Sequence, residues 1–382
     1  MSHVGRVLSQ EAVSRFASAY ARNPQNKLAA AAVVKTKLHD VLTAPDLTAR
    51  FPHQFNHRIE LEGKATSQKS SGRCWLFAGL NLMRLAVMKR YNLDDTFELS
   101  QSYLFFYDKL EKSNWFLESM LNNDILDAAI GDRTLDFLLA DPVQDGGQWS
   151  MFVALVEKYG VVPKSVHGET FQAQNSAQTR WLVTCRLREA AAAFRKMHKA
   201  GATLDEIRQH KDERLAEIYR ILAIAYGQPP TEPFNWCIRD KAKKFSEFPS
   251  LTPQQFYRDH VAIKLDDTIS LIHDPRHDYY RLYTVRYLGN VRQDGRGDEQ
   301  VLYVNVPIDV MMQLSAGRVK KGNPVWFGCE VGKHLSRTVG VMDLYSVDWK
   351  LGFGVEFEST KAERLEYGES KMTQYIFDYV YT

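Results

Sequence analysis

The residue types of thiol catalysis gather in one short segment of the chain, residues 68–77, which read QKSSGRCWLF. Cys74 stands where this glycine-containing segment enters an apolar run, residues 75–89, that contains no Pro and a single Gly. Such a run predicts a helix that is buried on most of its faces, with the cysteine at its start. Because the unpaired amides and the dipole of a helix N-terminus favour an anion, this position is expected to lower the pKa of the Cys74 thiol and to favour the thiolate.

Two neighbours of Cys74 extend this interpretation. Gly72 lets the backbone turn tightly just before the cysteine. Gln68 lies six residues upstream, so its amide can fold back beside the sulfur and donate, with the Cys74 N–H, to a developing oxyanion. Losing one such donor typically costs ~10²–10³ in rate. An inert buried cysteine is the alternative, but papain-like peptidases carry C-G-[SA]-C-[WY] here, and this chain keeps its Gly, second Cys and aromatic residue.

Composition and charge are those of an ordinary globular protein. Of the 382 residues, 45% are hydrophobic and 25% are charged, and the formal net charge is +3. This balance argues against disorder and does not by itself suggest a nucleic-acid binder. No apolar stretch approaches the ~18 residues of a membrane-spanning helix, and the first residues have no apolar core of signal-peptide length. We therefore expect a cytoplasmic protein that does not enter a membrane.

The chain has few cysteines, and their spacing indicates a reducing compartment. They form no CxxC pair, and no His lies at zinc-ligand spacing from them. Four cysteines in a chain of this length do not make a disulfide framework. We expect neither a metal nor an organic cofactor. The cysteines are Cys74, Cys185, Cys237 and Cys329.

The pattern of residue types divides the chain into four segments. Residues 1–66 are typical of an N-terminal arm, and residues 67–175 predict a helical lobe with the nucleophile helix. Residues 176–254 are rich in Ala, Arg, Glu and Leu and predict a helical insertion split by Gly201. Residues 255–382 turn to strand patterns, so helices precede strands and the fold class is α+β. The expected strands cover residues 279–288, 300–306, 324–331 and 351–357.

The segment around Cys74 closely resembles that of the bleomycin hydrolase family, cytosolic aminopeptidases of the papain superfamily. The resemblance runs over roughly residues 50–373 and is not confined to the nucleophile. Further matching segments are SQSYLFF at 100–106, DGGQW at 145–149, EKYGV at 157–161, FYR at 256–258, residues 323–334 and YGES at 367–370.

This resemblance implies a papain-like cysteine peptidase fold in two lobes, one helical and carrying the nucleophile, the other rich in strands. It implies that Cys74 attacks the carbonyl of a peptide or amide substrate through an acyl-enzyme, with Gln68 as oxyanion donor. It also implies a ring-shaped homohexamer with active sites facing a central channel. In the family, a C-terminal tail restricts cleavage mainly to peptide N-termini. Some relatives bind DNA, so weak nucleic-acid binding is a further expectation.

Gly146 and Gly147 resemble the glycine pair that binds the substrate backbone in papain-like clefts. Without side chains, they would let an extended peptide pair directly with the main chain. The alternative is an ordinary tight turn before a helix predicted over residues 149–159, which ends at Gly160. The sequence leaves these two interpretations open.

The chain departs from the family where the general base should stand. In the family a His follows Tyr-Gly-Glu-Ser-x-Met-Thr, whereas this chain has Gln374 after Thr373 and no Asn-Ser-Trp motif. Gln has no titrating nitrogen, so it cannot act as a general base. We expect the β-rich lobe to stop before the family's His and Asn strands, with residues 372–381 in a central strand. A truncated or spliced product and a gene-model error both fit this ending.

Three other histidines are candidates for the missing base. His198 and His210 lie at roughly papain-like distance after Cys74 but in the charged helical insertion, where a solvated helix face is expected. His334 follows a predicted buried strand, yet the family has a His there besides its catalytic one. The alternative function is therefore a catalytically dead isoform or a non-catalytic assembly or binding subunit. Such a subunit would hold peptides or nucleic acid through the basic segments 241–244 and 318–321.

Overall fold

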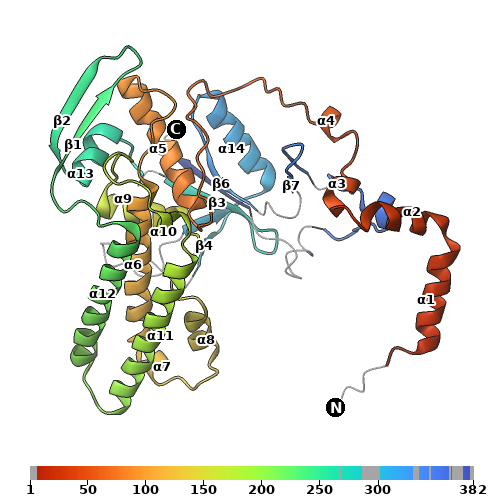
Figure 1. Ribbon diagram of the computed structural model, residues 1–382, viewed down its shortest axis with the longest axis horizontal. Coiled ribbons are helices and arrows are strands. Elements are labelled where there is room, and N and C mark those ends of the chain that lie inside the picture. Colours follow the sequence, from red (N-terminus) through yellow and green to blue (C-terminus); the bar gives the residue numbers. More distant parts are fainter. Residues whose placement is uncertain are drawn as a thin grey trace. The chain divides into compact units, whose positions relative to one another are not determined.

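Contacts between residues divide the chain into two compact units in the computed structural model (Figure 1). The larger unit comprises His57–Gly328 with Gln374–Thr382, and the smaller comprises Met1–Asn56 with Cys329–Thr373. The four segments expected from the sequence stay a prediction. The structure describes residues 7–265, 268–285, 302–329, 335–343, 346–360 and 363, and the backbone of residues 373–378.

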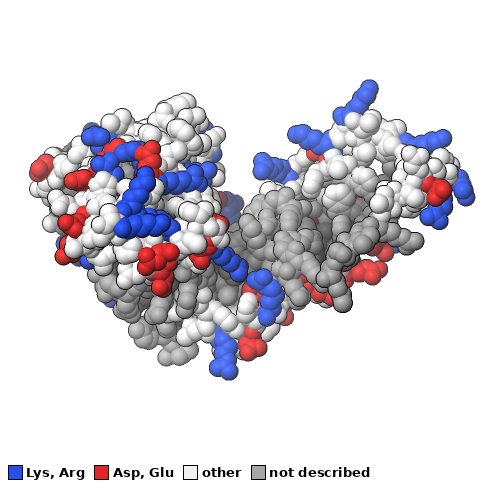
Figure 2. Space-filling model, turned by 90° about the horizontal axis from the view of Figure 1, so that it is seen from below, with Lys and Arg blue, Asp and Glu red and all other residues white. Residues whose placement is uncertain are grey.

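Charges of both signs are mixed on the surface. On the face of the larger unit that is seen at the left in Figure 2, Lys and Arg side chains are interspersed with Asp and Glu side chains. This mixture agrees with the small net charge of +3. That face therefore lacks the single-signed field that steers a strongly charged partner.

Three long helices form the core of the larger unit. Helix α5 starts at Cys74, and nine of its 18 residues are buried, which confirms the helix predicted there. Helix α6 begins at the N-cap Ser100, whose side chain accepts a hydrogen bond from Tyr103 N, and it packs against both α5 and α9. Helix α9 ends at Gly160, as the sequence predicts. The helices of this core and its edge are α5 (Cys74–Tyr91), α6 (Gln101–Met120), α7 (Asn123–Leu126), α8 (Arg133–Ala140), α9 (Trp149–Tyr159) and α10 (Phe171–Gln174).

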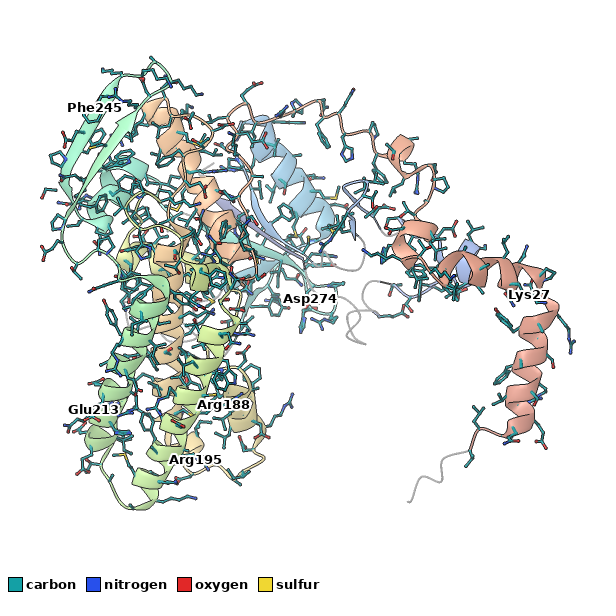
Figure 3. All side chains as sticks on the ribbon, in the orientation of Figure 1. Lys27, Arg188, Arg195, Glu213, Phe245 and Asp274 are labelled. Atoms are coloured by element: carbon teal, nitrogen blue, oxygen red, sulfur yellow. The ribbon has the colours of Figure 1, made fainter. Side chains whose placement is uncertain are left out.

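A helical hairpin, α11 (Ala177–Lys199) and α12 (Leu204–Tyr226), packs against α6. Gly201 in its turn has a φ of 86°, a left-handed conformation that favours glycine. Figure 3 shows Arg188 and Arg195 along α11. Arg188 donates to the carbonyls of the α8 end, and Arg195 donates to carbonyls beside α7, so side chains tie the hairpin to the short helices.

The expectation that strands begin after residue 255 is wrong in detail. A β-hairpin, β1 (Phe234–Arg239) and β2 (Phe245–Leu251), precedes the short helix α13 (Pro253–Phe256) and the π-helical turn η1 (Tyr257–Val261). Trp236 of β1 is buried and stacks on Phe248 of β2, with ring centroids 5.2 Å apart. Apolar residues alternate only along β1, so the periodicity of β2 gives a weak signal.

A five-stranded sheet of order β4-β5-β3-β9-β6 completes the larger unit. Strand β9 lies between β3 and β6, which confirms the central strand expected near residue 374. The parallel strands β3 and β5 pack against α14 through Leu271, Val306 and Met311. The elements are β3 (Thr268–His273), β4 (Leu282–Thr284), β5 (Leu302–Asn305), α14 (Ile308–Lys320), β6 (Trp326–Gly328) and β9 (Thr373–Asp378).

The smaller unit is built from short elements, and one of them corrects a prediction. Residues 351–357 were expected as a strand, but α15 (Trp349–Phe353) is a helix. Asp348 caps it by accepting from Leu351 N, and Gly354 ends it with a φ of 66°. Its other elements are α1 (Gln10–Arg22), α2 (Pro24–Val33), α3 (Leu38–Leu42), α4 (Leu47–Arg50), β7 (Leu335–Ser336) and β8 (Val341–Met342). Within the described residues of both units, no helix has the length and apolar character to cross a membrane.

Candidate active site

Cys74 is the first residue of α5 and is exposed, whereas the next three residues, Trp75 to Phe77, are buried. The helix is therefore anchored by its apolar first turn while the thiol remains accessible to a reagent or substrate. Arg73, at the N-cap, makes no side-chain hydrogen bond to the first turn of the helix. The amides of this turn thus receive no acceptor from the cap, and they lie where negative charge is stabilised.

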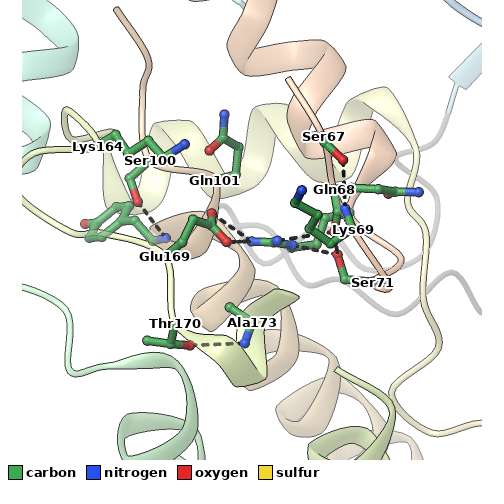
Figure 4. Close-up of polar contacts among 12 residues, drawn as sticks. Ser67, Gln68, Lys69, Ser71, Ser100, Gln101, Lys164, Glu169, Thr170 and Ala173 are labelled. Carbon is green, nitrogen blue, oxygen red and sulfur yellow. Dashed lines mark hydrogen bonds and ion pairs between the residues drawn. The ribbon is translucent and has the colours of Figure 1, made fainter. Parts of the chain in front are cut away.

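Arg73 anchors the segment that carries Cys74. Its side chain is completely buried, and Nη1 lies 3.0 Å from Oε1 and 2.9 Å from Oε2 of Glu169. Nε donates to Ser71 Oγ at 2.8 Å, and Nη2 donates to the Gln68 carbonyl at 3.5 Å. Figure 4 shows Glu169 approaching this network from one side, with Ser71 and Gln68 on the other. One buried guanidinium therefore joins the loop of residues 68–73 to the segment before α10.

The hydrogen bonds that fix Gln68 are made by its main-chain carbonyl. Its carbonyl also accepts from Ser71 Oγ at 2.6 Å, which closes the loop just before the helix. Its side-chain Oε1 is buried and has no hydrogen-bond partner among the described residues. The structure thus places Gln68 in the loop that leads into α5 at Cys74, and the role of the Gln68 amide as oxyanion donor stays a prediction.

The predicted glycine pair lies against the same segment. We call residues 143–147 the glycine loop. Gly146 N donates to Gly72 O at 3.1 Å, and a Cβ at Gly72 would lie 2.2 Å from Cβ of Asp145. A Cβ at Gly147 would lie 2.7 Å from the Trp75 ring. The glycine loop therefore touches residues on both sides of Cys74, and its binding of a substrate stays a prediction.

Two lysines that the sequence analysis missed lie beneath this loop. Lys109 and Lys112 of α6 are 2% and 1% exposed, and their ammonium groups contact carbonyls of the glycine loop. Burial lowers the pKa of Lys112 to about 8, although Asp108 beside it acts in the opposite direction. Burial raises the pKa of Asp145, but Lys109, Arg180 and Lys112 more than offset this and lower it. The signal in the sequence that could have identified these lysines is the group of charged residues within the largely apolar segment 103–117.

The three other histidines that the sequence analysis considered have separate outcomes. His198 Nε2 lies 3.0 Å from Oδ1 of Asp127, and His210 Nδ1 lies 3.5 Å from Oε2 of Glu213. Both are half-buried on the α11–α12 hairpin rather than on a fully solvated face. His334 lies outside the described residues. Gln374 of β9 pairs with Gly328 of β6. The side chain of Gln374 also lies outside the described part of the chain.

A cavity of about 750 Å³ lies elsewhere in the larger unit, and Cys74 does not line it. Its apolar lining comes from the C-terminal half of α5, among others Leu82 and Leu85, and from Trp149 and Trp326. The two basic segments noted in the sequence meet there, because Lys241, Arg318 and Lys320 all contribute to the wall. No group of three metal-ligating side chains occurs in the described ranges of the chain.

Cys74 is exposed at the start of a helix, the loop that contains Gln68 precedes it, and the glycine loop lies against it. This arrangement is typical of the class of papain-like cysteine peptidases. Comparison with known families agrees, since the model of the Peptidase C1-like family matches residues 7–377. The chain belongs to this family.

Individual relatives are similar over most of the chain. Bleomycin hydrolase of Homo sapiens is 40% identical over 372 residues, which are 96% of this chain and 80% of that protein. Aminopeptidase C of Lactococcus lactis subsp. lactis is 40% identical over 310 residues, 81% of this chain and 68% of that protein. The crystal structure of PepW from Lactobacillus rhamnosis matches with a TM-score of 0.91 at 38% identity, and covers 98% of this chain and 82% of that chain.

Proposed function

We propose that this chain is a cysteine aminopeptidase of the bleomycin hydrolase and aminopeptidase C type, with Cys74 as its nucleophile. The Cys74 thiolate attacks the carbonyl of a peptide or amide, and an Sγ–C bond forms. The C–N bond then breaks as the leaving amine takes a proton from water. Attack of a second water on the acyl carbonyl breaks the Sγ–C bond and releases the acid. Gln68 and the Cys74 N–H donate to the oxyanion, while Gly146 and Gly147 pair with the substrate backbone.

The observation that carries this proposal is the position of Cys74. It is the exposed first residue of α5, which is otherwise half-buried, and it follows a loop fixed by the buried Arg73. An inert core cysteine would be covered, and a surface cysteine would lack this support. The similarity to bleomycin hydrolase and aminopeptidase C, which extends over most of the chain, gives independent support.

Proton transfer limits the expected turnover. Gln374 occupies the position of the family's His, and an amide cannot take the thiol proton or return it to the leaving amine. We therefore expect Cys74 of this 382-residue chain to react with electrophiles, but the chain to turn over amides slowly or not at all. A homohexamer and a cytoplasmic location belong to the same proposal.

Two assays separate the thiol chemistry from turnover. The first follows hydrolysis of an aminoacyl fluorogenic amide by the chain and by Cys74→Ala. The second restores the family residue with Gln374→His in the same chain, with Gln374→Asn as its control. Turnover above the Cys74→Ala background in Gln374→His alone supports the proposed base position. Alkylation by iodoacetamide that is unchanged by Cys74→Ala would contradict the assignment of the nucleophile.

The cavity favours a second candidate, a non-catalytic binding subunit. Lys241 and Lys320 come from segments far apart in the sequence and line one cavity with an apolar floor. Positive walls over apolar residues suit an acidic peptide that carries aliphatic side chains. For the alternative of a non-catalytic binding subunit, this cavity is the proposed binding site.

Trp149 and Trp326 line this cavity, so their fluorescence reports on an added ligand. We expect a glutamate- and leucine-rich peptide to quench it in the wild type and less in Lys241→Ser/Lys320→Ser. The double variant Lys27→Ser/Lys35→Ser is the control, because those lysines lie outside the cavity lining. Equal quenching in all three proteins, or binding of single-stranded DNA but not of the peptide, contradicts this candidate.

A further inference from the structure

We propose that Lys109 and Lys112 of α6 are positioning residues, which hold the glycine loop against the Cys74 segment so that a substrate backbone is aligned with the thiol. This inference rests on the proposed function, because it gives the loop a role beside the nucleophile. It concerns residues that contact neither the sulfur nor a substrate.

Lys109 holds the first half of the glycine loop. Its Nζ donates to Val143 O at 3.1 Å, to Gln144 O at 2.9 Å and to Oδ1 of Asp145 at 3.0 Å. It also lies 5.2 Å from the centroid of the Phe105 ring. The three donors of an ammonium group are therefore matched by three acceptors of the loop.

Lys112, one helical turn further along α6, holds the second half. Its Nζ donates to Gln144 O at 2.9 Å and to Gly146 O at 2.7 Å. The third contact is with Asp108, where Nζ lies 2.9 Å from Oδ1. The ammonium also faces the Trp75 ring at 5.5 Å from its centroid. Lys112 thus contacts both the loop and the residue that follows Cys74.

The loop transmits this hold to the catalytic segment. Gly146 N donates to Gly72 O. Gly72 has no room for a Cβ because Asp145 packs against it, and Gly147 has none because it packs against the Trp75 ring. Movement of the loop by even a small distance would therefore break the hydrogen bond to Gly72. Misplacement of a reacting group by about 1 Å can cost ~10²-fold in rate.

Each charge around the loop has a partner of opposite sign. Lys109 and Lys112 face Asp108 on their own helix and Asp145 on the loop, and Arg180 of α11 lies 3.1 Å from Oδ2 of Asp145. Buried charges persist when they are paired and hydrogen-bonded. Here much of the bonding goes to main-chain carbonyls, so removing one lysine leaves loop carbonyls without their donor.

The first test measures the position of the loop without any catalysis. We compare amide hydrogen exchange at Gly146 in the full chain, in Lys112→Met and in Lys211→Met. Lys211 is the matched control, since it is a buried lysine of α12 that pairs with Glu118 of α6. We expect exchange in Lys112→Met to be faster by about tenfold or more, the loss expected for a hydrogen bond to a charged group. Unchanged exchange would overturn the inference.

The second test connects the loop to Cys74. The peptidyl epoxide E-64 needs a peptide-binding surface, whereas iodoacetamide does not. In the reaction of Cys74 with E-64, the Sγ–C bond forms as the epoxide C–O bond breaks, and the resulting alkoxide takes a proton from water. We expect Lys112→Met to slow E-64 labelling of Cys74 by ~10²-fold and to leave iodoacetamide labelling unchanged. Equal slowing of both reagents, or of neither, contradicts the positioning role.

Failure of the proposed function gives a different result. If neither reagent labels Cys74 in the wild type, the nucleophile assignment fails, and exchange at Gly146 still decides whether the lysines hold the loop. Lys112→Arg keeps a charged donor at this position, so it serves as the control in case Lys112→Met does not fold. We expect Lys112→Arg to react with E-64 faster than Lys112→Met does. Equally slow E-64 labelling of the two variants would overturn the role of a charged donor at this position.

Discussion

Ion pairs occur in two settings in the larger unit, around the Cys74 segment and along the α11–α12 hairpin. Around Cys74, Arg73, Lys109 and Lys112 are at most 2% exposed, and they donate largely to main-chain carbonyls and loop side chains. On the hairpin, Arg186 is 29% exposed and its partner Glu189 is 65% exposed, so this pair remains partly in water. Buried cations therefore hold the backbone around Cys74, whereas the pairs of Arg186 lie at the surface of the hairpin.

The largest effect should follow from removing a cation near Cys74. Arg73→Met leaves the Glu169 carboxylate, which is 13% exposed, without its partner. Breaking a buried pair in this way typically costs ~3–5 kcal/mol of unfolding free energy. Urea denaturation with Arg73→Lys as the conservative comparison measures it. A loss below about 1 kcal/mol, the value of a surface pair, would erase the contrast between the two regions.

A pH titration sharpens the comparison. The pKa of Lys112 is lowered from 10.5 to about 8 in the folded chain, so between these values the unfolded chain binds more protons and stability from this group rises with pH. The expected rise is about 3 kcal/mol of unfolding free energy, from ~1.4 kcal/mol for each pH unit. Denaturant melts of the wild type and Lys112→Met at pH 7.5 and 10.5 measure it. Identical pH dependence in the two proteins would contradict the burial of this charge.

A third change tests the tight contact between the two loops. Gly72→Ala puts a Cβ 2.2 Å from Cβ of Asp145, so the glycine loop must shift. Overpacking of this kind typically costs ~1–3 kcal/mol, and E-64 labelling should slow together with it. Gly168→Ala is the matched control, because a Cβ there meets no atom within 4 Å. Equal melting midpoints and labelling rates for the two variants would show that the loop has room to move.

The smallest effect belongs to the hairpin. Arg186 lowers the pKa of Glu217 through a hydrogen bond, yet both groups remain partly exposed. Pairs of this kind contribute ~0.2–1 kcal/mol. Arg186→Met should therefore change the unfolding free energy by less than about 1 kcal/mol and leave labelling of Cys74 unchanged. A larger loss in denaturant melts would place the hairpin pairs in the same class as those around Cys74.

The sequence predicted the elements whose signals are local. The nucleophile helix shows as an apolar run without Pro, and the helix at 149–159 shows by its stop at Gly160. The α11–α12 hairpin shows by its helix-favouring composition, split at Gly201. Residues 349–353 show the limit, because a short apolar run with glycines suits a strand or a helix, and the Asp348 cap decides it.

The candidate site was predictable in its nucleophile but not in its support. Lys109 and Lys112 contact residues more than 30 positions further along the chain, and no periodicity in a helix records such partners. Burial of the two lysines follows from tertiary contacts, which include the loop carbonyls and the Phe105 and Trp75 rings. The pairing of Arg73 with Glu169, 96 residues away, was hidden for the same reason.

The central claim is that Cys74 is a nucleophile made reactive by its position. Cys237 is also exposed, so it serves as an internal control in the same molecule. Peptide mapping by mass spectrometry after a short exposure of the full chain to E-64 at neutral pH compares the two directly. We predict an adduct on Cys74 and none on Cys237. Adducts at equal rates on both cysteines, or an adduct on Cys237 alone, would contradict the account.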